Sequence, residues 1–132
     1  MRKMIIASHS QLAEGFKKTL DFFTGGNDRI IALCAYTDQR TEDIRPLIEE
    51  LLNDEDEFIV LTDMAGGSVN QRFFPHMSDR VHVISGINLP LAISIAVQLD
   101  NPRIDIPQLV AEARQQLIYV NNQTSQKETS DE

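Results

Sequence analysis

The segment Leu61-Thr62-Asp63-Met64-Ala65-Gly66-Gly67-Ser68-Val69-Asn70 connects an apolar run to the start of a helical pattern. The run before it, 58–61, is typical of a buried strand. Glycine lets an anion approach the backbone, and the unpaired N–H groups of a first helical turn point outward to bind it. The segment therefore predicts a phosphate site, with Gly66, Gly67 and Ser68 as its phosphate-binding residues.

The same segment places a carboxylate, Asp63, directly after the strand. A negative charge beside a bound phosphate is unfavourable, because like charges repel at close range. We therefore interpret the carboxylate as the partner of a third group, separate from the phosphate. The sequence offers such a group in His9, which follows the apolar run at 4–7.

The overall composition is that of one globular domain. The chain has 132 residues, of which 42% are hydrophobic and 24% charged, so it can bury a proper core. We assign this domain to residues 1–121 and interpret residues 122–132, which include no apolar side chain, as a disordered polar tail. The net charge of −8 argues against a nucleic-acid surface, which needs clustered Lys and Arg.

The location that the sequence favours is the cytoplasm. No apolar run approaches the roughly 20 residues of a membrane span. The apolar run near the N-terminus is too short for a signal peptide. The single cysteine, Cys34, excludes an internal disulfide and fits a reducing compartment. Because Cys34 lies in an apolar run, we interpret it as an inert buried thiol.

Four apolar runs alternate along the chain with segments of helical periodicity. The runs are 4–7, 30–35, 58–61 and 81–84, and the helical segments are 12–23, 44–51, 69–77, 91–99 and 105–117. This alternation predicts an α/β fold: a doubly wound, mainly parallel sheet of flavodoxin-like order 2-1-3-4 with helices on both faces.

In such a sheet a crevice opens at the carboxyl ends of strands one and three, where the winding reverses. His9 follows strand one and Asp63 ends strand three. We therefore expect the two side chains to face each other across the crevice. The helix start at 67–68 should form the wall of this crevice.

Several helix ends carry capping signals. Thr41 is expected to cap the second helix, with the acidic residues 42–43 in its first turn. Asn88 and Asp105 are expected to cap the fourth and fifth helices. Leu117 should lie on the inner face of the fifth helix.

The pair of His9 and Asp63 suggests phosphoryl transfer. A histidine can take a phosphoryl group on one ring nitrogen if that nitrogen carries a lone pair, so the other must hold the proton. A carboxylate that accepts this proton fixes the tautomer and stabilises the charge on the ring. Phosphoryl transfer otherwise needs mainly positioning and charge stabilisation, which the helix start and the Ser68 hydroxyl can supply.

Plainer interpretations of the same residues stay open at this point. A histidine beside a carboxylate often only caps a helix, and a glycine turn after a strand is often a matter of geometry alone. His82 alternates with valines in a strand and is interpreted as structural, and His76 as a surface or capping residue. Three histidines without ligand spacing do not predict a metal site, and we expect no cofactor.

Three segments resemble the IIA component, EIIA, of the mannose-type branch of the bacterial phosphoenolpyruvate-dependent sugar phosphotransferase system. The family's active-site histidine segment is similar to Ala7-Ser8-His9-Ser10-Gln11-Leu12-Ala13-Glu14-Gly15. Its Asp-x-x-Gly-Gly-Ser turn is similar to Asp63-Met64-Ala65-Gly66-Gly67-Ser68. Its Gly-x-Asn-x-Pro turn is similar to Gly86-Ile87-Asn88-Leu89-Pro90-Leu91. The resemblance covers roughly residues 1–120. The order of the three segments and their placement at strand ends make it specific.

The resemblance implies a role for each of these residues. His9 would accept a phosphoryl group from the small carrier protein HPr, as a phosphohistidine intermediate, and pass it to a IIB subunit that serves a membrane sugar permease. Asp63 would be the partner of the histidine, and Ser68 a phosphate contact. The chain departs from the family at Ser10, where glycine is common, and at Val69, where proline is common.

We also expect a homodimer. The helix at 91–99 is apolar nearly all round, and together with the last helix it should leave apolar surface for a second subunit to cover. The resemblance implies dimers that often exchange a C-terminal strand. Here the chain is polar after Val120, so strand exchange is not evident.

Two other functions fit the same residues. One is the phosphoryl-donor subunit of phosphotransferase-linked dihydroxyacetone kinase, which has the same fold and histidine. The other is a non-catalytic module that binds an anion at the glycine turn. The sequence does not identify the transported sugar, because a phosphoryl carrier never contacts it.

Overall fold

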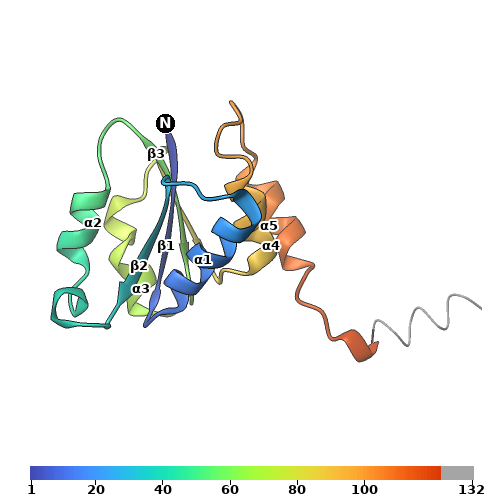
Figure 1. Ribbon diagram of the computed structural model, residues 1–132, viewed down its shortest axis with the longest axis horizontal. Helices are drawn as coiled ribbons and strands as arrows, with labels where there is room; N and C mark the ends of the chain where they lie inside the picture. The colour runs from blue at the N-terminus through green and yellow to red at the C-terminus, as the bar shows by residue number, and fades with distance from the viewer. Residues whose placement is uncertain (123–132) are drawn as a thin grey trace, which may run out of the picture.

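Strands and helices alternate along the chain, as the sequence predicts. The computed structural model describes residues 1–122 (Figure 1), so residues 123–132 of the predicted tail lie outside the described part. In chain order the elements are β1 (Arg2–His9), α1 (Leu12–Thr24), β2 (Ile30–Ala35), the 3-10 helix η1 (Gln39–Thr41), α2 (Arg45–Leu51), β3 (Glu57–Thr62), α3 (Ser68–Arg72), the 3-10 helix η2 (Phe74–His76), β4 (Val81–Ser85), α4 (Leu89–Ala96) and α5 (Ile106–Arg114).

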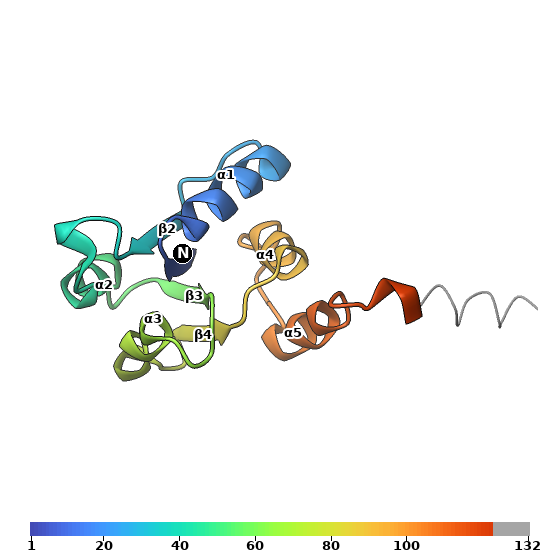
Figure 2. The ribbon, with the colours of Figure 1, turned by 90° about the horizontal axis from the view of Figure 1, so that it is seen from below.

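The four strands form one sheet in the order β2-β1-β3-β4, and all neighbouring pairs are parallel. Figure 2 shows α1, α4 and α5 on one face of this sheet and α2 and α3 on the other. The predicted doubly wound α/β fold and its flavodoxin-like order are thus confirmed. The winding reverses between β1 and β3, and sheets of this kind bind ligands at the carboxyl ends of the two strands where it reverses. We call this region of the structure the crevice.

The central strand β1 is buried on both of its faces. Met4 and Ile6 pack in one apolar cluster with residues of α1, α4 and α5. Ile5 and Ala7 point the other way and pack in a second cluster with residues of α2 and α3. A strand covered on both sides needs apolar residues at every position, which explains the unbroken run at 4–7.

Three predicted helices end earlier than the sequence pattern suggests. The fourth, predicted to reach residue 99, ends as α4 at Ala96. The third helix ends as α3 at Arg72 and is followed by η2, in which Pro75 has no N–H for an α-helical bond. The fifth helix ends at Arg114. The chain after it leaves the body of the fold (Figure 1), and Leu117 is 91% exposed instead of lying on an inner face.

The second helix begins later than predicted. Thr41 ends η1 and forms a reciprocal capping box with Asp38, while α2 begins at Arg45. The Thr41 hydroxyl accepts hydrogen bonds from the N–H groups of Thr37 and Asp38, at 2.9 and 3.0 Å, so it serves the loop and not the helix.

The caps predicted for α4 and α5 are confirmed. The Asn88 side chain accepts a hydrogen bond from the N–H of Leu91 at 3.0 Å. The Asp105 side chain accepts one from the N–H of Gln108 at 3.1 Å.

We predict that Phe58→Ala lowers the free energy of unfolding by about 3–5 kcal/mol, because it leaves a cavity in the core. Phe58 is fully buried in the cluster between β3 and the helices α2 and α3. Phe22 is 83% exposed on α1, so Phe22→Ala should change that free energy by no more than about 0.5 kcal/mol. Urea unfolding followed by circular dichroism compares the two variants, and equal losses would contradict the assignment of the core.

Candidate functional site

The crevice at the carboxyl ends of β1 and β3 holds the predicted pair of His9 and Asp63. His9 is the last residue of β1, and Asp63 directly follows the last residue of β3. The two strands are neighbours, with Ala7 of β1 opposite Thr62 of β3. The register of the sheet therefore brings the histidine and the carboxylate together, although they are far apart in the sequence.

Both hydrogen bonds between the two residues end on one carboxylate oxygen. Oδ2 of Asp63 accepts the backbone N–H of His9 at 2.8 Å, and it lies 2.8 Å from the ring atom Nδ1. An ionised carboxylate only accepts hydrogen bonds, so Nδ1 must carry the proton in this pair. A neutral ring then has its lone pair on Nε2.

The electrostatics of Asp63 favour this arrangement. Its side chain is only 8% exposed, whereas that of His9 is 35% exposed. Burial raises the pKa of Asp63, but the hydrogen bonds from the backbone and ring of His9 outweigh burial, and the pKa lies below its ordinary value. Asp63 therefore stays a carboxylate at neutral pH. Its second oxygen, Oδ1, is buried without a hydrogen-bond partner among the described residues.

The glycine turn packs against the imidazole. A Cβ placed on Gly67 would lie 3.0 Å from Cε1 of His9, which is tighter than ordinary contact, so a hydrogen at this position lets the ring fit. A Cβ on Gly66 would have no neighbour within 4 Å. Of the two predicted phosphate-binding glycines, Gly67 thus lies directly against the histidine, and Gly66 does not.

The start of α3 faces the same crevice. The N–H of Gln71 donates to the carbonyl of Gly67 at 3.2 Å, so the N–H groups of Ser68 and the two residues after it have no acceptor within the helix. Ser68 follows Gly67, and its hydroxyl lies 2.6 Å from the hydroxyl of Tyr36. Ser68 thus lies next to the glycine that packs against His9, and it has a partner, Tyr36, that the sequence analysis missed.

Tyr36 is the first residue after β2, and its ring centroid lies 5.5 Å from that of His9. The signal that could have found it is its position, because a residue at the carboxyl end of a strand beside β1 belongs at the crevice.

Two departures from the family pattern have simple structural reasons. Ser10 has a φ of 56°, in the left-handed region that glycine adopts most easily, which explains why glycine is common there. Its N–H donates to the carbonyl of Ala35 at 2.8 Å, which holds this conformation. Val69 is fully buried in the cluster with α2 and α3, so it extends the core.

A buried network that the sequence analysis also missed supports the turn. The Thr62 hydroxyl lies 2.8 Å from Oδ1 of Asn70, and Nδ2 of Asn70 donates to the carbonyl of Ala65 at 2.9 Å. Asn70 is 4% exposed. The amide therefore connects the end of β3, the middle of the turn and the start of α3 from inside.

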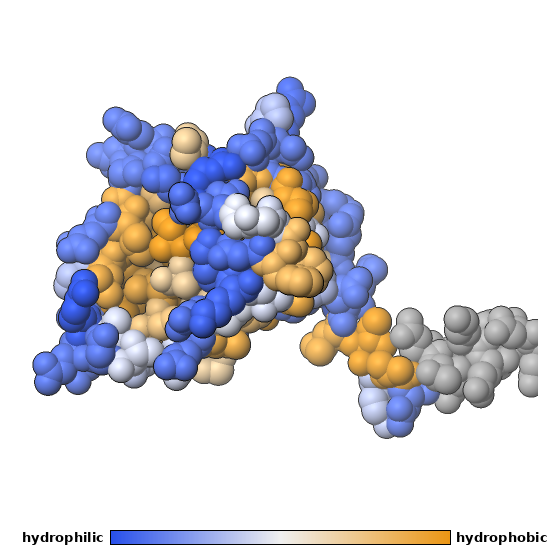
Figure 3. Space-filling view, in the orientation of Figure 1, coloured by the Kyte–Doolittle hydropathy of each residue, from blue (hydrophilic) through white to orange (hydrophobic). Residues whose placement is uncertain are grey.

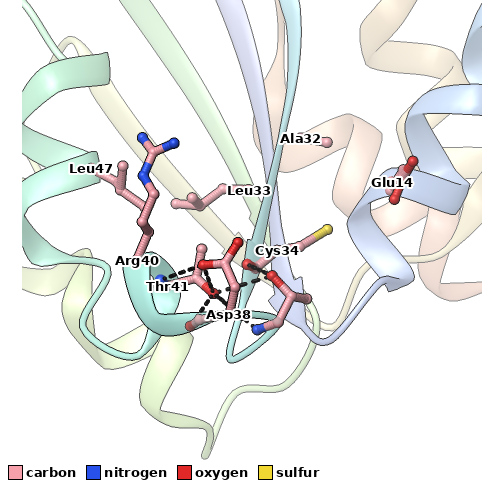
Figure 4. Close-up of a pocket in the computed structure, with 9 residues that line it drawn as sticks. Glu14, Ala32, Leu33, Cys34, Asp38, Arg40, Thr41 and Leu47 are labelled. Atoms are coloured by element: carbon pink, nitrogen blue, oxygen red, sulfur yellow. Dashed lines mark hydrogen bonds between the residues drawn. The ribbon is translucent and has the colours of Figure 1, made fainter.

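The other candidate residues lie outside the crevice. Nε2 of His82 lies 3.3 Å from Glu57, near the opposite ends of the strands, and His76 belongs to η2. Cys34 is partly exposed and not buried as predicted, and it lines a pocket at the open edge of β2 with Leu33 and other residues drawn in Figure 4.

Residues 1–122 contain no group of His, Cys, Asp and Glu side chains that could hold a metal ion. Over the same range, no helix has the length and apolar character to cross a membrane.

The family of the chain follows from comparison with known proteins. The profile of the EIIA-man family, described as the PTS system fructose IIA component, matches residues 3–113. The chain belongs to this family. As an EIIA-type chain it is a phosphotransfer component of the phosphotransferase system, as the sequence resemblance implied. No curated protein matches the chain.

Solved structures similar to this EIIA chain come from several bacteria. A Klebsiella pneumoniae protein proposed to be a permease of the phosphoenolpyruvate-dependent sugar phosphotransferase system has 33% identity and a TM-score of 0.81, over 93% of each chain. The IIA protein associated with the fucose utilization operon of Streptococcus pneumoniae has 29% identity and a TM-score of 0.78, over 93% of this chain and 96% of that one.

The component EIIA of Streptococcus agalactiae, at 21% identity and a TM-score of 0.74, shares the fold over 92% of this chain and 99% of its own. Together with the family match, the first two similarities support a role in a sugar phosphotransferase system.

We predict that Gly67→Ala disturbs the pair of His9 and Asp63, whereas Gly66→Ala does not. The new methyl group at position 67 presses on Cε1 of the ring, while position 66 opens on free space. Nitrogen NMR of the imidazole reports which ring atom carries the proton. We expect the Nδ1–H form in the native chain and in Gly66→Ala, and a mixture of tautomers in Gly67→Ala. Native-like ring signals in Gly67→Ala would show that the close packing is unimportant.

Proposed function

We propose that the chain is a phosphoryl carrier that accepts phosphate from phospho-HPr on Nε2 of His9 and passes it to a IIB subunit. The observation that carries the proposal is the hydrogen bond between Nδ1 of His9 and the buried carboxylate of Asp63. A ring proton on Nδ1 in this bond supports Nε2 as the nucleophile of the proposed reaction. The side chain of His9 is 35% exposed, which is consistent with access by a partner protein.

In the first half of the reaction, the lone pair of Nε2 attacks the phosphorus atom of phospho-HPr. The bond between phosphorus and HPr breaks, and its electron pair stays with HPr. The proton on Nδ1 stays in place, and the Asp63 carboxylate offsets the positive charge that grows on the ring. The second half is the same displacement with IIB as nucleophile and His9 as leaving group, so the carrier returns to its starting state.

The phosphoryl oxygens need donors close to His9. The Ser68 hydroxyl and the N–H groups of the first turn of α3, which have no acceptor within the helix, are the donors nearest to the turn against His9 that fit this need. Gly67 supports binding by letting the imidazole approach the turn. The N–H of Gly67 itself donates to the carbonyl of Met64 at 3.2 Å, so its part is steric. Gly66 lies at an open position of the turn, where a Cβ would have no neighbour within 4 Å.

We predict that His9→Ala abolishes labelling by radioactive phosphoenolpyruvate in the presence of enzyme I and HPr. The fold should persist, because a partly exposed crevice side chain contributes little to the core. The label on the native chain should be labile in acid and stable in base, as expected of a phosphohistidine. His76→Ala is the matched control and should be labelled normally. Labelling that survives His9→Ala would refute the proposal.

Asp63→Asn, tested in the same assay, should slow labelling without preventing it. The amide keeps the size of the side chain but can offer an N–H to the ring, which favours the wrong tautomer. Loss of the orienting carboxylate costs up to about 10⁴-fold in rate in a Ser-His-Asp triad, and an activated phosphoryl donor should make the loss smaller here. Full-speed transfer in Asp63→Asn would reduce Asp63 to a turn residue.

The proposal includes a homodimer. β4 is an edge strand of the sheet, and a groove beside it is lined by apolar residues of β4, the following loop and α5, among them Ile84 and Val110. The chain after α5 presents Leu117 and Ile118, which are 91% and 42% exposed. Figure 3 shows this segment as an apolar strip just before the grey residues. Apolar surface of this kind favours burial against a second subunit.

We predict that the native chain sediments as a dimer at concentrations of about tens of micromolar, within the range of ordinary specific association. The double variant Leu117→Ser/Ile118→Ser should shift the population toward monomer, because it removes apolar area from the contact. Phe22→Ser, at a position on α1 that is 83% exposed, is the matched control and should leave the dimer intact. A monomer mass for the native chain would contradict the proposed dimer.

A further inference from the structure

Tyr36 is held in an unusual backbone conformation. Its φ is 64°, in the left-handed region, which is rare for a bulky residue. Such conformations persist where the surroundings hold them, and they concentrate at functional sites. Connecting β2 to α2 does not by itself require a positive φ at a tyrosine, so this conformation suggests a functional reason at this position.

The loop around Tyr36 is tied by its own hydrogen bonds. The N–H of Tyr36 donates to the carbonyl of Thr41 at 2.9 Å. Thr41 and Asp38 bond reciprocally, as the dashed lines in Figure 4 show. The hydroxyl of Thr37 lies 3.3 Å from the carbonyl of Cys34. A loop fixed in this way presents the Tyr36 side chain in one direction.

That direction is toward the phosphoryl site. The Tyr36 ring lies at 38° to the ring of His9, with centroids 5.5 Å apart, and its hydroxyl lies 2.6 Å from the hydroxyl of Ser68. The side chain thus connects the end of β2 to the start of α3 across the end of β1. Tyr36 is 48% exposed, so the hydroxyl contact forms where water could otherwise replace it.

The contact between the two hydroxyls has a direction that follows from their acidity. A phenol is a stronger acid than an aliphatic alcohol, so the Tyr36 hydroxyl is the better donor and Ser68 the better acceptor. When the Ser68 hydroxyl accepts this bond, its own hydrogen points away from Tyr36. Accepting a hydrogen bond also polarises the Ser68 O–H group and makes it a stronger donor. The open direction next to Gly67 and His9 is where the phosphoryl oxygens would lie.

We infer that Tyr36 is a positioning residue for phosphoryl transfer at His9: its hydroxyl donates to Ser68 and so directs the serine hydrogen to the phosphoryl group. The inference rests on the proposed function and adds to it a group from β2, which no motif of the sequence includes. Tyr36 forms no bond with the phosphoryl group itself. Its whole effect on the reaction therefore passes through Ser68.

The test is a double-mutant cycle in phosphoryl transfer from phospho-HPr. Tyr36→Phe keeps the ring and removes the hydroxyl, and Ser68→Ala removes the acceptor. We expect Tyr36→Phe to lower kcat about fivefold, the equivalent of one ordinary hydrogen bond, with little change in KM for phospho-HPr. In the Ser68→Ala background the same change should have no further effect, because the route through Ser68 is already lost.

The matched control is Tyr119→Phe, which removes the only other tyrosine hydroxyl of the chain, outside the crevice. It should leave kcat unchanged. Phosphorus NMR of the phosphorylated chain supplies a readout that fold stability does not affect: Tyr36→Phe and Ser68→Ala should shift the phosphohistidine signal, and Tyr119→Phe should not. The melting temperature of Tyr36→Phe checks that its fold is intact.

The possible results separate the two proposals. A native chain that takes up no phosphate on His9 refutes the proposed function, and the inference with it. A native chain that is phosphorylated while Tyr36→Phe transfers at full speed with an unshifted phosphorus signal overturns the inference alone. Independent, multiplying effects of Tyr36→Phe and Ser68→Ala would also overturn it, since Tyr36 would then act without Ser68.

Discussion

The site depends on a single carboxylate oxygen that accepts two hydrogen bonds from one residue. Oδ2 of Asp63 binds both the backbone N–H and Nδ1 of His9. The backbone bond ties the loop after β3 to the end of β1, so the relative position of the two loops is set. In the proposed reaction, the ring bond leaves Nε2 as the nitrogen that reacts. The position and the tautomer of His9 therefore depend on the same carboxylate oxygen, so the proposed function predicts that the charge of Asp63 matters more than its size.

The backbone around this contact is shaped to leave room for it. Gly67 lets the turn lie against the imidazole, and the left-handed conformation of Ser10 carries the chain away from β1 directly after the histidine. Asn70 then holds the turn from the buried side. These residues act through their shape and their hydrogen bonds, and none of them is itself a reactive group. Together these features of the surrounding backbone position His9 and Asp63, so the geometry of the pair depends on the whole crevice and not on the two side chains alone.

The fold and the facing of His9 and Asp63 could be predicted, because both follow from periodicity and from the rule that parallel strands meet at one edge. The place of Tyr36 after β2 was readable in the same way, but its contact with Ser68 was not, because that contact depends on a positive φ and on a loop closed by Asp38 and Thr41. Neither leaves a periodic signal in the sequence. The early end of the third helix is a different case, since Pro75 was a readable stop signal.

The geometry of the crevice also affects how the two partners of the proposed carrier, phospho-HPr and the IIB subunit, bind to it in sequence. Nε2 of His9 is one atom at one edge of the sheet, flanked by the ring of Tyr36 and the turn at Gly67. A donor and an acceptor that both need this atom have to use the same surface, so they exclude each other. Under the proposed function, exchange would therefore follow ping-pong kinetics, in which the residence time of either partner limits the flux. A surface under that constraint favours brief, modest binding to two different proteins over tight binding to one.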